Sequence, residues 1–233
     1  MSLNELLLLG LGTVVLAAAV LSIYPGELSW FGVRFHSRLY DASASNYEQK
    51  WSRHNYEPYD KAVRDAASHL CQLDSPMVLD LCSGTGRALF EAVKTIGPRG
   101  NYTAVDGSGN MIRRSQNRAA TLDKDTSSQI KFTVADVDTW LADAAPGSFD
   151  LITLMEASEF IPRFPVVFPR ITACIRRGGI LVLTYPTTPY ALTFPGRRQL
   201  RGQMHRLIGA AGMVIQKDMS WRARYRICMA VKP

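Results

Sequence analysis

An acidic residue and two glycines follow a short aliphatic run in the stretch Val78–Arg87. The run around Asp80 has the composition of a buried strand, Cys82–Gly86 forms a glycine-rich turn, and residues 87–94 have a helical pattern. The first amides of a helix lack intrahelical partners. A strand, a glycine turn and a helix start therefore present backbone N–H groups to a ligand. Residues further along the chain must identify that ligand.

Two more carboxylates stand at the ends of predicted strands, namely Asp106, followed by Gly107, and Asp136. In an open α/β sheet, ligands bind at the carboxyl ends of the strands. Asp106 lies about twenty residues beyond the glycine turn, where a carboxylate can accept hydrogen bonds from two ribose hydroxyls. Asp136 can accept a hydrogen bond from an exocyclic amine such as N6 of adenine. N-capping explains either residue alone, but the ordered set predicts a nucleoside site.

The spacing of the glycines separates two kinds of nucleoside site. A dinucleotide site needs G-x-G-x-x-G for close approach of the pyrophosphate, and Leu89 occupies the third glycine position. The pattern acid-x-small-x-Gly-x-Gly is filled instead, by Asp80, Cys82, Gly84 and Gly86. The spacing therefore disfavours a nicotinamide-dependent oxidoreductase.

The elements that must position these residues alternate along the chain. Aliphatic runs predict strands at Met77–Leu81, Asn101–Val105, Ile130–Val134, Phe149–Met155 and Ile180–Thr184. Helical patterns occupy 58–73, 88–95, 110–122, 137–144, 166–176 and about 197–211. This alternation predicts a parallel α/β sheet covered by helices on both faces. The last runs, 213–217 and 224–231, are joined too briefly for a crossover and must be antiparallel.

With these features, the chain resembles the class I S-adenosyl-L-methionine (SAM)-dependent methyltransferases. Within them it is most similar to the ubiquinone/menaquinone-biosynthesis type (methyltransferase domain type 11/25). The resemblance covers about residues 38 to 233, and Cys82 stands where the family more often has glycine. It rests on segments in the family's order, Leu79–Gly86, Ala104–Met111, Val134–Val137, Phe149–Glu156, Arg176–Val182 and Ala230–Pro233.

The resemblance implies a Rossmann-like α/β fold with a seven-stranded sheet in the order 3-2-1-4-5-7-6, strand 7 being antiparallel. It implies SAM as cofactor and methyl transfer by in-line displacement, which depends mainly on positioning. The cofactor-binding positions carried over are Asp80, Leu81, Cys82, Ser83, Gly84, Gly86, Asp106, Gly107, Met111, Ala135, Asp136, Val137 and Met155.

The acceptor is less well defined by the sequence. The fourth strand ends in Met155–Ser158 and lacks the Asn/Asp-Pro-Pro-aromatic signature of DNA and protein-glutamine enzymes. Glu156 and Glu159 are candidate bases, or acids that favour a helix N-terminus. Several aromatic residues could enclose an apolar acceptor or simply pack a lid, namely Tyr40, Tyr47, Tyr185, Tyr190 and Phe194.

Leu6–Ile23 contains no charged residue, and a bilayer crossing needs about 20 apolar residues. The sequence favours a membrane anchor over a signal peptide or a core helix, with contact through residues 3–24. Arg34 and Arg38 follow the segment, so the positive-inside tendency predicts a single-pass protein whose large domain faces the cytoplasm. The predicted division is residues 1–24 as transmembrane helix, 25–55 as linker and helical lid, and 56–233 as methyltransferase domain.

The net charge of +7 favours an anionic partner, or serves only solubility. Much of it lies in arginines that could meet anionic head groups or form a solvated face, namely Arg197, Arg198, Arg201, Arg206, Arg222, Arg224 and Arg226. Four dispersed cysteines and four dispersed histidines give no support for a metal site.

The predicted acceptor is therefore small or lipid-like, such as a quinone precursor or a phospholipid amine. The alternative is a membrane-tethered adaptor that keeps the fold without catalysis. Nucleic acid is disfavoured because no aromatic and basic residues interleave as in a strand-binding groove.

Overall fold

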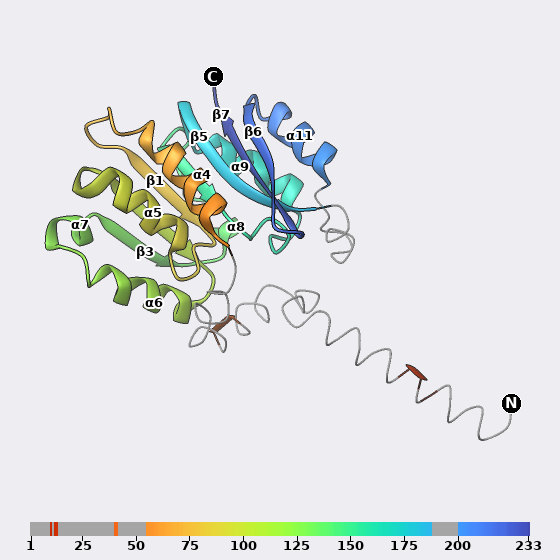
Figure 1. Ribbon diagram of the computed structural model, residues 1–233, viewed down its shortest axis with the longest axis horizontal. Coiled ribbons are helices and arrows are strands. Elements are labelled where there is room, and N and C mark those ends of the chain that lie inside the picture. The colour runs from red at the N-terminus through yellow and green to blue at the C-terminus, as the bar shows by residue number, and fades with distance from the viewer. Residues whose placement is uncertain (1–9, 11, 14–39, 42–54, 188–199) are drawn as a thin grey trace, which may run out of the picture.

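The computed structural model describes residues 10, 12–13, 40–41, 55–187 and 200–233 (Figure 1). These residues contain a seven-stranded sheet in the order β3-β2-β1-β4-β5-β7-β6. The strands are β1 (Met77–Leu81), β2 (Asn101–Asp106), β3 (Ile130–Val134), β4 (Phe149–Leu154), β5 (Ile175–Pro186), β6 (Val214–Trp221) and β7 (Tyr225–Val231). Strands β1 to β5 pair in parallel, and β7 is antiparallel to both of its neighbours. The predicted fold class and strand order are confirmed.

Helices cover both faces of this sheet (Figure 1). One core cluster joins the sheet to α4 (Glu57–Ser68), α5 (Arg87–Ile96) and α6 (Gly109–Ala119). The other joins it to α8 (Val137–Trp140), α9 (Phe164–Ala173) and α11 (Arg201–Ala210). The short η3 (Gly97–Arg99) and α7 (Lys124–Ser128) lie in connections between strands. Every residue of β4 is buried, as expected for a central strand covered on both faces.

Strand β5 starts at Ile175, five residues before the predicted start at Ile180. Gly178 was expected to form a turn, and its φ of +78° does suit one. The strand continues through it because Lys232, beyond β7, pairs with both glycines. The Gly178 N–H donates to the Lys232 carbonyl at 2.6 Å, and the Lys232 N–H donates to the Gly179 carbonyl at 3.0 Å. A partner distant in sequence thus decides where this strand begins.

In the part of the chain that the structure describes, no helix is long and apolar enough to cross a membrane. A crossing needs about 20 consecutive apolar residues. The longest helix described here, α4, has 12 residues and carries charged side chains. This finding contradicts the predicted single-pass localisation with a cytoplasmic domain, which is withdrawn. Except for residues 10, 12 and 13, the predicted anchor of residues 1–24 lies outside the described residues, as does most of the predicted linker and lid.

Candidate functional site

The turn after β1 has a left-handed backbone at three positions. Cys82, Gly84 and Gly86 have φ of +53°, +54° and +83°. Glycine adopts this conformation at little cost, whereas other residues are strained in it. At Gly86 the space is also closed, because an added Cβ would lie 2.5 Å from the Ser115 Oγ. The left-handed conformation explains why glycine occupies positions 84 and 86. It also makes Cys82 the strained residue of the turn.

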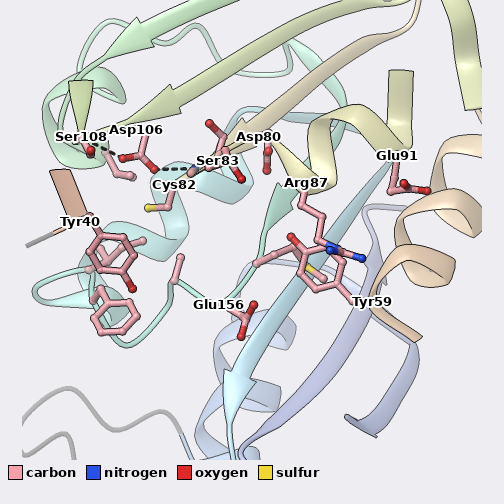
Figure 2. A pocket seen from close by; sticks show the side chains of 18 of the residues that line it. Tyr40, Tyr59, Asp80, Cys82, Ser83, Arg87, Glu91, Asp106, Ser108 and Glu156 are labelled. Carbon is pink, nitrogen blue, oxygen red and sulfur yellow. Dashed lines mark hydrogen bonds between the residues drawn. The ribbon is translucent and has the colours of Figure 1, made fainter. Parts of the chain in front are cut away.

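Two carboxylates hold this turn against the sheet. Asp80 accepts hydrogen bonds from the Thr153 hydroxyl at 2.6 Å and the Leu89 N–H at 3.2 Å. Asp106 accepts from the Gly84 N–H and the Ser108 N–H, both at 2.8 Å (Figure 2). Asp106 thereby joins the end of β2 to the turn that follows β1.

Burial sets the protonation of these groups. Burial raises the pKa of Asp80 to about 7, although the hydrogen bonds from Thr153 and Leu89 act to lower it. Burial also raises the pKa of Asp106, although two backbone N–H groups favour its carboxylate. Burial, together with the nearby Asp106, raises the pKa of the Cys82 thiol well above its ordinary value. Cys82 is therefore a neutral thiol at neutral pH.

A cavity of about 530 Å³ opens beside the turn (Figure 2). Nine of the predicted cofactor-binding residues line it, namely Asp80, Cys82, Ser83, Gly84, Asp106, Gly107, Asp136, Val137 and Met155. The other four do not. Leu81 and Met111 are fully buried, Gly86 caps α5, and Ala135 packs against the core.

The polar groups of the turn fit a polar ligand. Ser83 is buried, and its hydroxyl has no hydrogen-bond partner within the described residues. A buried hydroxyl without a partner costs free energy, which a ligand group can restore. Nothing lies within 4 Å of the position that a Cβ at Gly84 would take. A carboxylate offers about four acceptor sites, so Asp106 can still accept hydrogen bonds from a ligand.

Away from the turn, the cavity is lined by aromatic and apolar residues together with charged ones, namely Asp60, Arg87, Glu91, Lys94, Arg118 and Glu156 (Figure 2). Tyr40 meets Phe160 edge-on, with ring centroids 6.3 Å apart. Tyr56 packs under the Arg87 guanidinium, which lies 4.0 Å from its ring centroid. Tyr56, Phe160 and Arg87 were not predicted, because their contacts join segments far apart in sequence.

Other acceptor-site predictions are not supported by the contacts. Tyr185 is buried and its hydroxyl donates to Asp218 at 3.0 Å, away from the cavity. Glu159 is fully buried and does not line the cavity, and neither candidate base stands in a helix. Tyr47, Tyr190 and Phe194 lie outside the described residues, as do Arg197 and Arg198.

Part of the basic cluster is neutralised by carboxylates. Arg201 and Arg226 pair with Asp218 at 2.9 and 2.8 Å. Arg222 pairs with Glu156 at 3.3 Å. These three arginines therefore do not form a freely solvated basic face.

Replacing Cys82 by glycine is expected to leave stability unchanged or raise it by up to about 1 kcal/mol. The left-handed backbone costs a non-glycine residue about 1–2 kcal/mol, and glycine relieves this strain. The unfolded chain also becomes more flexible with glycine, which offsets part of the stability gained. Ligand affinity should persist, since the change removes only a neutral thiol and keeps the left-handed backbone of the turn. Denaturant unfolding and a SAM titration measure both effects. A large loss of affinity would show that the ligand is placed wrongly.

Comparison with known proteins identifies the family of this chain. A family model described as a methyltransferase domain matches residues 74–226. A demethylmenaquinone methyltransferase from Lactococcus lactis is 26% identical over 157 residues, which cover 65% of this chain and 59% of that protein. A nocamycin O-methyltransferase from Saccharothrix syringae is 31% identical over 138 residues, covering 55% of this chain and 46% of that protein. The chain thus spans about half the length of these curated relatives.

A solved structure has the same fold. Magnesium protoporphyrin IX methyltransferase from Synechocystis PCC 6803, determined with bound SAM, superposes with a TM-score of 0.58 at 17% identity. The match covers 75% of this chain and 80% of that one. At this identity the likeness concerns the fold alone.

Proposed function

Because the chain belongs to the family of SAM-dependent methyltransferase domains, we propose that it transfers the methyl group of SAM to a small aromatic acceptor. The observation that carries the proposal is one cavity with two unlike sides. Asp80, Ser83 and Asp106 stand at the strand ends, and the Tyr40–Phe160 pair and the Glu156 carboxylate line another part of it.

The polar side would hold the cofactor. Asp106 would accept hydrogen bonds from the ribose hydroxyls, and Asp136 from the adenine amine. The Ser83 hydroxyl, which has no hydrogen-bond partner among the described residues, and the amides of the turn would meet the amino-acid end. When bound, SAM supplies an electrophilic methyl group on a sulfonium. The protein then has to orient the acceptor in line with the carbon–sulfur bond.

The other side would hold the acceptor. Its Tyr40–Phe160 pair favours a flat apolar molecule. Two relatives are named for a demethylmenaquinone and for O-methylation of nocamycin. These names and the lining support an aromatic or quinol-like acceptor. A phospholipid amine depended on the predicted membrane anchor and is not retained.

Incubation with methyl-labelled SAM tests this function. The full chain would be given a phenol, a naphthol and an aliphatic amine, and the organic extract would be analysed for label. We expect label in an aromatic product, with Asp106→Ala as the blank. Cofactor binding without transfer to any acceptor would favour the non-catalytic adaptor, and transfer to the amine alone would exclude the aromatic acceptor.

A further inference from the structure

Glu156, which lines the cavity, has a strained backbone. It follows the end of β4 and has a φ of +51°, a conformation that is costly for a residue with a side chain. Its N–H donates to the Thr184 hydroxyl at 2.5 Å, which fixes it to β5. Strain that the surrounding structure maintains is concentrated at functional sites. The strained backbone is a first reason to examine this carboxylate.

The Glu156 carboxylate lines the cavity, and its two hydrogen bonds within the described part of the chain are long. One oxygen accepts from the Tyr56 hydroxyl at 3.3 Å, and the other from an Arg222 nitrogen, also at 3.3 Å. The Asp60–Arg87 pair in the same cavity is bidentate at 2.8 and 2.7 Å. Glu156 is therefore held in place while retaining acceptor sites for a ligand proton.

The surroundings of Glu156 suit a base. Burial raises the pKa of Glu156, while Arg222, the Tyr56 hydroxyl and Arg87 oppose that rise. Glu159 is the nearby acid, and it accepts from the Tyr225 hydroxyl and from Ser158 in the core. Glu159 thus serves a buried structural network, whereas Glu156 is the carboxylate of the pair that reaches the cavity.

We propose that Glu156 is the catalytic base of this site and that the acceptor atom is the oxygen of a neutral aromatic hydroxyl. This inference rests on the proposed function. The acceptor hydroxyl would donate its hydrogen bond to a Glu156 oxygen and direct its lone pair toward the methyl group. Tyr56 and Arg222 act as positioning residues, because they contact the carboxylate and hold its orientation.

The step balances without another reactant. The oxygen–carbon bond forms as the carbon–sulfur bond breaks, and the electron pair of that bond goes to sulfur. The hydroxyl proton passes to Glu156 and later to solvent. A base helps because the hydroxyl retains its proton at neutral pH. An anionic acceptor would need no base and would be repelled by Glu156.

Glu156→Gln is expected to lower kcat by about 10²–10⁴-fold and to change the affinity for SAM by less than about threefold. The kcat of the wild type should fall as pH drops through the raised pKa of Glu156, since only the carboxylate accepts a proton. In the variant, this fall of kcat at low pH should disappear. Its kcat should instead rise with pH up to the pKa of the acceptor hydroxyl, because only the ionised acceptor reacts without a base. Glu57→Gln, at an exposed glutamate of α4, is the matched control and should behave as wild type.

Binding without SAM gives a second readout. Wild-type protein should bind 1-naphthol about tenfold more tightly than 1-methoxynaphthalene, because only the naphthol donates a hydrogen bond. Glu156→Ala should remove this preference. If Glu156→Gln does not fold, Tyr56→Phe serves instead and should shift the acid limb of kcat to higher pH. Loss of the Tyr56 hydrogen bond raises the pKa of the carboxylate.

The outcomes separate the two proposals. Absence of SAM binding in the wild type would overturn the proposed function. Methyl transfer with kcat, pH profile and naphthol preference unchanged in the Glu156 variants would overturn the base alone. A carbon-methylated or nitrogen-methylated product would likewise overturn the hydroxyl acceptor.

Discussion

Asp106→Ala is expected to weaken the binding of SAM by about 10²–10⁴-fold. Hydrogen bonds to a charged acceptor contribute roughly 1.5–3 kcal/mol each, and the variant would lose two to the ribose hydroxyls. Asp106 also accepts from the Gly84 and Ser108 N–H groups, so part of the loss comes from a less ordered turn. Calorimetric titration measures the affinity, and thermal unfolding shows whether the fold persists. Asp125→Ala, at an exposed acid of α7, should bind as wild type.

An analogue of the ligand isolates the ribose contribution. Wild-type protein should bind S-adenosylhomocysteine far more tightly than its 2′,3′-dideoxy analogue, whereas Asp106→Ala should distinguish the two poorly. A variant that still prefers the hydroxylated ligand as strongly as wild type would show that Asp106 does not contact the ribose.

Asp218→Ala is expected to lower the free energy of unfolding by about 3 kcal/mol, or the melting temperature by roughly 6–12 °C. The Asp218 side chain is 5% exposed and contacts Arg201, His205 and Arg226. Its removal also leaves the buried Tyr185 hydroxyl without its acceptor. The substitution therefore leaves several hydrogen-bond donors without their shared carboxylate, in a region that does not line the cavity.

The pH dependence of this loss has a definite sign. Burial alone would raise the pKa of Asp218, but hydrogen bonds from Arg226, His205 and Arg201 outweigh it and lower the pKa. A lowered carboxyl pKa stabilises the fold above the unfolded value, near 4, and that contribution disappears as the pH falls. The difference in the free energy of unfolding between wild type and Asp218→Ala should therefore be largest at pH 7 and should shrink below about pH 4.

A surface pair provides the control for Asp218. Asp65 bonds Lys61 at 2.8 Å on the exposed side of α4. Asp65→Ala should cost no more than about 0.5 kcal/mol, since exposed ion pairs contribute little. Equal losses in the two variants would contradict the role given to the Asp218 cluster.

Local patterns were sufficient to predict the sheet and one side of the cavity. Hydrophobic runs and connection lengths fix the strands, and carboxyl ends of parallel strands meet at one edge. Asp80, Asp106 and Asp136 could therefore be brought together from sequence order alone. Cys82 could be recognised as unusual, but its strain follows only from the observed φ of +53°.

The acceptor side could not be predicted in the same way. Tyr56 contacts Glu156 across 100 residues of sequence, and Arg222 reaches it from the turn between β6 and β7. Such contacts depend on how helices and turns pack, and they leave no periodic pattern in the chain. The apolar run Leu6–Ile23 was interpreted from composition alone, which cannot establish a spanning helix.

The most direct test of the central claim is a calorimetric titration of the full chain with SAM. The proposed site predicts saturable binding of one SAM per chain, displaced by S-adenosylhomocysteine, and no comparable binding of a nicotinamide dinucleotide. Absence of SAM binding, or equal binding of the dinucleotide, would contradict the assignment of the cavity beside the Cys82–Gly86 turn.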